Sequence, residues 1–153
     1  MEATTEAAML RVLVLMAEAD GFIASEEQNM LQDICNQHFR GSSSDGWRVA
    51  LSSEMDLKRA ATAIADSERP LTLKLAYMLI SACGEERGFP INPAELYAFN
   101  ALVNHLELTE DQREQAVTAA KRDLNNSPDP WSMLRTQFSK HFGKGKDVSE
   151  NTL

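Results

Sequence analysis

The chain is poor in the residues that cross-link or interrupt a polypeptide backbone. Its 153 residues include 2 cysteines, 5 prolines and 7 glycines. Two cysteines are too few for a disulfide framework, and Cys35 and Cys83 both have apolar neighbours, so we expect two buried thiols. The scarcity of proline and glycine leaves long stretches of the chain free to form helices.

Positive charge is scarce as well. The net charge is -8, and the basic residues gather into no stripe, so we expect no nucleic-acid partner. No apolar run is long enough for a transmembrane helix, and the acidic start at residues 1–6 lacks the positive charge of a secretory signal. These features predict a cytoplasmic protein that does not itself span a membrane.

The residue patterns of common catalytic sites are also missing. The sequence has no histidine pair at metal-ligand spacing, no glycine-rich phosphate loop after a strand and no nucleophile elbow. Cys35 and His38 are one helical turn apart, but both fall on an apolar face, and a metal site needs three or four ligands. We therefore expect that the protein is not an enzyme.

Helix-start signals recur along the chain, whereas strand signals are nearly absent. Ser25 and Thr109 each precede a glutamine by three residues, which is the pattern of a capping box. We expect helices over about residues 4–19, 25–40, 53–65, 71–82, 93–106, 109–124 and 131–142. The sequence therefore predicts one all-α domain, a bundle of about seven helices over 1–142, followed by a flexible polar tail over 143–153.

The two halves of this domain share a pattern, which indicates an internal two-fold duplication. Residues 22–27 align with 90–95, and the same offset of 68 residues pairs the apolar positions that follow. The repeat halves are about 4–66 and 70–124. Residues 10–17 and 75–82 are apolar on nearly every side, so we expect these two helices at the centre of the bundle.

An acidic cluster is the feature most suggestive of function. Asp20, Gly21 and Glu27 resemble the second half of a calcium-binding EF-hand loop, with Gly21 as a left-handed turn residue. Met16 occupies the position of the first ligand, which excludes a true EF-hand. A partial cluster of Asp20, Glu26 and Glu27 remains.

The duplication adds a fourth acid, because Glu95 is the repeat equivalent of Glu27. These carboxylates, with Asp20 or the loop at 84–90, could converge on one divalent cation such as calcium, magnesium or manganese. The alternative is that the acids are solvated groups in first helical turns, where negative charge stabilises the helix dipole.

At these residues the sequence resembles the TerB-like family, which comprises the tellurite-resistance protein TerB and its helical relatives. The similarity covers about residues 10–120 and is carried by residues 19–23, 26–27, 91–95 and 102–109. It implies a duplicated all-helical fold, acidic residues that bind divalent metal, and a role in tellurite or broader chemical-stress response beside membrane-associated partners. The positions that match are Asp20, Glu27 and Glu95, with Glu26 a weaker match; Gly88 stands where the second half would need its equivalent of Asp20.

Two hypotheses about function follow. The first is a non-enzymatic TerB-like module that acts through protein contacts and a weakly bound divalent cation at Asp20, Glu26, Glu27 and Glu95. The second is a purely structural or adaptor domain with no metal site.

Overall fold

The computed structural model describes residues 3–19, 29, 54–86, 93–126 and 129–141 of the chain. These residues form six α-helices and one short 3-10 helix, and none of them is in a strand. The elements are α1 (Ala3–Ala17), α4 (Leu57–Ala63), η1 (Asp66–Glu68), α5 (Arg69–Glu86), α6 (Pro93–Leu106), α7 (Glu110–Asn125) and α8 (Pro130–His141). The all-α helical bundle is thus confirmed. The expected helix at 25–40, the tail at 143–153, Gly21 and Cys35 lie outside the described residues.

Helices α1 and α5 form the centre of the bundle, as expected from their apolar sequences. Both are covered on nearly every side, and each contacts the other. The apolar residues of these two helices that are at most 2% exposed are Ala8, Met9, Leu10, Val12, Leu13, Val14, Met16 and Ala17 of α1, and Leu73, Leu75, Ala76, Met78, Leu79, Ile80 and Ala82 of α5. Their burial supplies most of the hydrophobic stabilisation that the described residues provide. Cys83 lies in α5, but its side chain is outside the described part.

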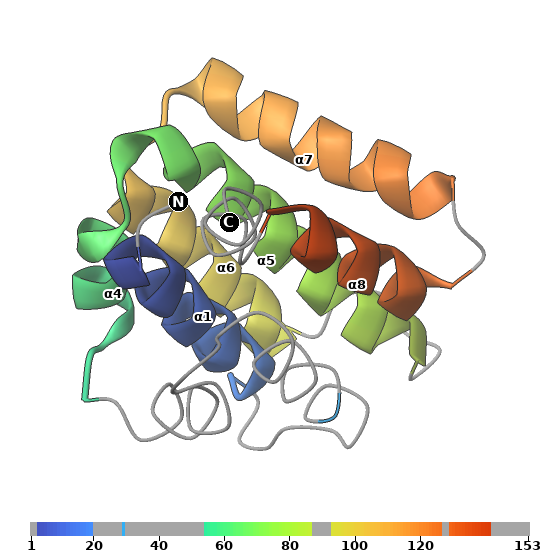
Figure 1. The fold of residues 1–153 in the computed structure, drawn as a ribbon, viewed down its shortest axis with the longest axis horizontal. Helices are drawn as coiled ribbons and strands as arrows, with labels where there is room; N and C mark the ends of the chain where they lie inside the picture. Colours follow the sequence, from blue (N-terminus) through green and yellow to red (C-terminus); the bar gives the residue numbers. More distant parts are fainter. Residues whose placement is uncertain (1–2, 20–28, 30–53, 87–92, 127–128, 142–153) are drawn as a thin grey trace, which may run out of the picture.

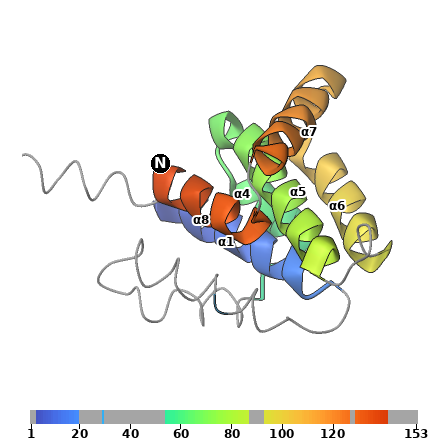
Figure 2. The same ribbon diagram turned by 90° about the vertical axis from the view of Figure 1, so that its right-hand side faces the viewer.

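The other helices pack around this pair. Helix α5 contacts α6, α7 and α8 as well as α1, while α1 also contacts α4 and α6. Helix α6 therefore packs into the interior, and α7 lies at the edge of the molecule, against α5 and α8 (Figures 1 and 2).

The helix starts agree with the sequence at α7 and differ from it at α4. At α7 both bonds of the expected capping box form: Thr109 Oγ1 accepts from the Gln112 backbone N–H at 3.1 Å, and Gln112 Oε1 accepts from the Thr109 N–H at 3.0 Å. Helix α4 begins at Leu57, not at Ser53, because Asp56 is itself the N-cap and accepts from the Arg59 N–H at 2.8 Å.

Helix α5 is longer than the sequence indicates at both ends. It begins at Arg69 and not at about residue 71, because Pro70 fits within the first turn, where its missing N–H is not needed. The expected loop from Gly84 is wrong as well, since the helix continues through Gly84 to Glu86. A single glycine costs a helix only about 1 kcal/mol.

Arg69 joins the ends of two helices to the start of α5. Its Nε donates to the Ile64 carbonyl at 3.1 Å, its Nη1 to Leu106 O at 3.2 Å and its Nη2 to Thr62 O at 3.3 Å. The Asp66 carboxylate also lies 3.4 Å from Nε, but it is 94% exposed and contributes little. Carbonyls at helix ends lack partners within the helix, so one guanidinium here satisfies acceptors at the ends of α4 and α6.

None of the helices in the described ranges is both long enough and apolar enough to cross a lipid bilayer. The internal duplication stays a prediction, because residues 22–28 and 30–38, which carry most of its first copy, lie outside the described ranges.

Candidate functional site

Glu95 is the one predicted metal ligand that the structure describes, and it is buried. It lies in the first turn of α6, two residues after Pro93 starts the helix, and only 1% of its surface is exposed. The residue has interaction partners within the fold. Its Oε1 atom accepts no hydrogen bond among the described residues. An acid that served only to favour the helix dipole would remain in water, so the solvated interpretation is wrong for Glu95.

The rotation of α6 about its axis places Glu95 inside. The buried residues Glu95, Phe99, Leu102 and Leu106 are spaced by four, three and four positions, which is one face of a helix. The apolar pattern of the sequence predicts that Leu96 and Val103 share this face with Phe99, Leu102 and Leu106. This prediction is wrong for Leu96, which is 42% exposed, and Val103 is half-buried.

This buried face turns toward three other helices. Helix α6 contacts α1, α4 and α5. Both ribbon views place the end of α1 and the beginning of α6 at the same end of the bundle (Figures 1 and 2). Glu18 follows the end of α1 and is half-buried there. Its backbone N–H donates to Val14 O at 3.0 Å. Glu18 and Ala19, the two residues before Asp20, therefore lie at the end of the bundle where Glu95 is buried.

The other predicted ligands cannot be placed against Glu95. Asp20, Glu26 and Glu27 lie outside the described residues. Within the described ranges, His, Cys, Asp and Glu side chains form no group of three or more that could hold a metal ion. Glu95 alone would supply two oxygens, whereas calcium takes about six to eight and magnesium about six. Any cation site at this end of the bundle therefore needs ligands from other segments.

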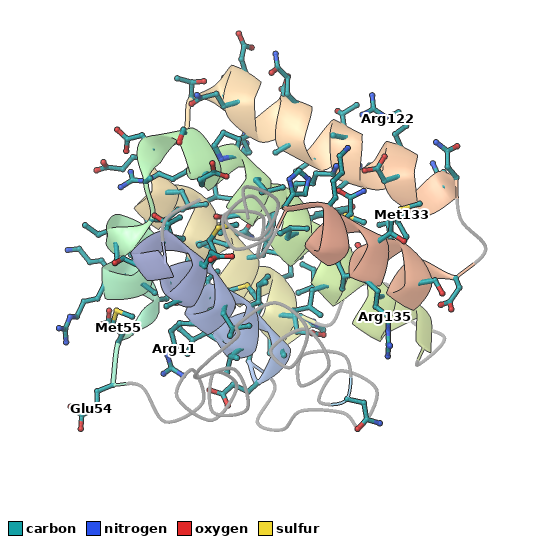
Figure 3. The ribbon with its side chains drawn as sticks, viewed as in Figure 1. Arg11, Glu54, Met55, Arg122, Met133 and Arg135 are labelled. Carbon is teal, nitrogen blue, oxygen red and sulfur yellow. The ribbon has the colours of Figure 1, made fainter. Side chains whose placement is uncertain are left out.

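Helix α1 carries two buried ionisable residues that its apolar pattern did not predict. Arg11 is 8% exposed and Glu6 is 7% exposed, although the surrounding helix is apolar. Arg11 Nε donates to the Met55 carbonyl at 2.9 Å, and the two residues lie next to each other in Figure 3. This bond ties α1 to the segment before α4. The sequence did hold the signal, because an arginine inside an apolar run must be paired when the helix is covered on all sides.

No family model matches this chain, and no curated protein or solved structure matches it either.

Proposed function

We propose that the protein is a non-catalytic helical module that acts by contacting other proteins and that binds one divalent cation at the end of the bundle where α1 ends and α6 begins. Glu95 is the buried ligand of this site, and Asp20, Glu26 and Glu27 complete it. Calcium, magnesium and manganese all accept such a set of carboxylate oxygens.

The burial of Glu95 carries this proposal. An ionised carboxylate that is 1% exposed loses nearly all of its hydration, which costs several kcal/mol unless positive charge or donors compensate. Glu95 has interaction partners within the fold, and a divalent cation would in addition compensate several carboxylates at once, Glu95 together with Asp20, Glu26 and Glu27. It would also explain why acids recur in the two matching segments of the sequence, at Glu27 and Glu95.

The resemblance to the TerB-like family supports the same proposal and adds a physiological setting. Members of that family are associated with tellurite and chemical-stress responses, and the matching positions here are Asp20, Glu27 and Glu95. We propose a corresponding role for this chain, with membrane-associated proteins among its partners.

Thermal unfolding in the presence of added cations tests the site. After treatment with a chelator, the protein would be titrated with calcium, magnesium and manganese while its melting temperature is followed by circular dichroism. A cation at about 100 times its Kd stabilises the fold by about 2.7 kcal/mol. For a domain of this size that corresponds to a rise of about 5–10 °C.

Two variants make the test specific to Glu95. Glu95→Gln keeps the shape of the side chain and removes the acid, so most of the cation-dependent rise in melting temperature should disappear. Glu110→Gln is the matched control, since Glu110 also lies in the first turn of a helix but is exposed; its rise should equal that of the wild type.

A melting temperature that does not change with any of the three cations would refute the cation site and leave the adaptor hypothesis. The same holds if Glu95→Gln retains the full rise. If Glu95→Gln does not fold, Glu27→Gln and a calorimetric titration give the same discrimination, because the proposal requires Glu27 as a ligand.

A further inference from the structure

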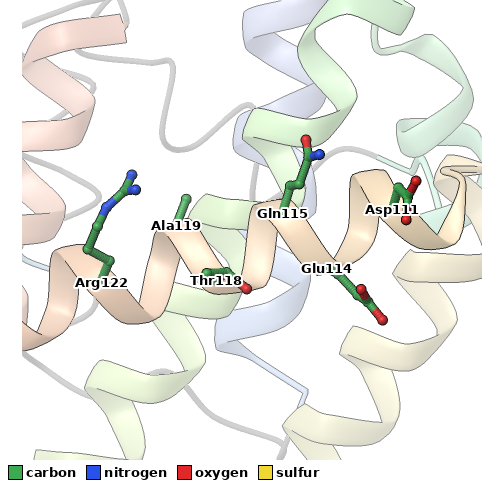
Figure 4. Close-up of a pocket in the computed structure, with 6 residues that line it drawn as sticks. All are labelled: Asp111, Glu114, Gln115, Thr118, Ala119 and Arg122. Carbon is green, nitrogen blue, oxygen red and sulfur yellow. The ribbon is translucent and has the colours of Figure 1, made fainter.

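The outward face of α7 carries an ordered row of polar residues. Asp111, Gln115, Thr118 and Arg122 are exposed and spaced by four, three and four positions, so they share one side of the helix. The buried residues of α7, Ala116 and Ala120, lie on the opposite side, and α7 packs on α5. Figure 4 shows Asp111, Gln115 and Arg122 pointing toward the same side of α7.

This face is hollowed. A depression of about 500 Å³ runs along it. It is lined by Asp111, Glu114, Gln115, Thr118, Ala119 and Arg122. The small side chains of Thr118 and Ala119 lie in the middle, two carboxylates lie at the end near the start of α7, and the guanidinium lies at the other end. Negative and positive charge are therefore separated along the row.

These charges have little to bind within the chain itself. Among the described residues, Asp111 and Glu114 take part in no ion pair. The Arg122 side chain is 68% exposed, and its Nε lies 3.9 Å from Asp123 Oδ1. Asp123 is held more closely by Lys74, at 2.6 Å from its Oδ2. The Arg122 guanidinium thus has most of its five donors open to a carboxylate from outside.

A row that is acidic at one end and basic at the other is complementary to itself in the antiparallel direction. If two copies of α7 meet across a two-fold axis between Gln115 and Thr118, each Arg122 faces Asp111 of the other copy, and Glu114 adds negative charge beside it. Both ends are then matched at the same time. A parallel arrangement would place like charges together, and a purely basic partner would leave Arg122 facing positive charge.

We propose that the outward face of α7 is a self-association surface, on which a second copy of this chain docks with its own α7 antiparallel. A helix of 16 residues is about 24 Å long, which gives a small contact compared with the 1,200–2,000 Å² that stable interfaces typically bury. Exposed ion pairs also contribute little individually. The dimer is therefore weak, forms at high protein concentration, and dissociates as ionic strength rises.

Sedimentation equilibrium over about 10 µM to about 1 mM protein measures this association. All samples contain a chelator, so the result does not depend on the proposed cation site, and Glu95→Gln should dimerise like the wild type. Raising the ionic strength from about 0.05 M to about 0.5 M should increase Kd severalfold.

Charge reversal on each end of the row gives a sharper test. Arg122→Glu makes the whole face negative, and the double variant Asp111→Lys/Glu114→Lys makes it positive, so each should raise Kd at least about tenfold. Mixing the two variants should restore dimers, because the faces are complementary again. Arg113→Glu is the control, because it changes the net charge by the same amount as Arg122→Glu and lies on the same helix. Arg113 is outside the row, since it lies about 200° around the helix axis from Asp111.

Circular dichroism confirms that each variant is folded before the comparison. The proposal is overturned if the wild type is a monomer at the highest concentration, if Arg122→Glu dimerises as well as Arg113→Glu does, or if the two oppositely charged variants remain separate when mixed. Restored dimers in the mixture support it, since a merely structural effect of the substitutions would persist there.

Discussion

Helices α6 and α7 follow one another in the chain, and each has a glutamate in its first turn, but the two glutamates have opposite surroundings. Glu95 of α6 is 1% exposed, whereas Glu110 of α7 is exposed beside a complete capping box. An acid in a first helical turn is therefore compatible with two different roles. In α7 the acid helps to start a helix, while in α6 it is a buried polar group that the interior of the fold must satisfy.

The neighbours of the two helices account for this difference. Helix α6 contacts α1, α4 and α5, whereas α7 contacts α5 and α8 and leaves one whole side in solvent. The helix ends differ in the same way. The last carbonyl of α6, Leu106 O, accepts a hydrogen bond from Arg69 of α5. The end of α7 is closed by a backbone hydrogen bond, in which the Asn126 N–H donates to Arg122 O at 3.1 Å.

Replacing the two glutamates by lysine should give the largest difference in stability loss between α6 and α7. Glu95→Lys places an ammonium where a carboxylate was compensated, so we expect a loss of about 3–5 kcal/mol in the free energy of unfolding. Glu110→Lys should lower it by about 1 kcal/mol at most, through the helix dipole. Urea denaturation of both variants measures the difference. Similar losses at both positions would mean that burial does not separate the two helices.

The ends of the helices should show a smaller contrast. Arg69→Met removes three hydrogen bonds to carbonyls, of which those to Ile64 O and Leu106 O are partly buried, and this loss should cost about 2–4 kcal/mol. Arg122→Met is the matched substitution near the end of α7 and should cost no more than about 0.5 kcal/mol. The same denaturation experiment compares them, and equal costs would show that Arg69 does not hold α4 and α6.

The smallest effect concerns the start of α7, which depends on local bonds alone. Thr109→Ala removes the hydroxyl of the capping box and should cost about 1 kcal/mol, while Thr109→Ser keeps the hydroxyl and should cost less. Amide hydrogen exchange should speed up in the first turn of α7 and stay unchanged at the start of α6. Faster exchange in both helices would contradict a local role for this cap.

The sequence was sufficient for features that depend on neighbours along the chain. The capping box of Thr109 and Gln112 forms because its partners are three residues apart and need no other element. The apolar character of α1 and α5 predicted the central pair, since a helix that is apolar on all sides must be covered on all sides. The spacing of Trp131, Leu134, Phe138 and Phe142 predicts one stripe on the last helix, and Leu134 of α8 is fully buried.

The candidate site could be predicted only in part. The repeat pattern singled out Glu95, but the apolar pattern predicted a buried face of Leu96, Phe99, Leu102, Val103 and Leu106. The structure buries Phe99, Leu102 and Leu106 of this set, but it also buries Glu95 and exposes Leu96. Hydrophobicity favours Leu96 over Glu95 in the core, so only packing against the other helices decided between them.

The sequence by itself thus determined the helical class, the central pair and the cap of α7, all of which follow from periodicity and contacts within a few residues. Only the tertiary structure decided the rotation of α6, the carbonyl partners of Arg69 and Arg11, and the burial of Glu95. The physical reason is the range of the interactions. Arg11 binds a carbonyl 44 positions away and Arg69 one that is 37 positions away, and no local pattern specifies which helices will meet there.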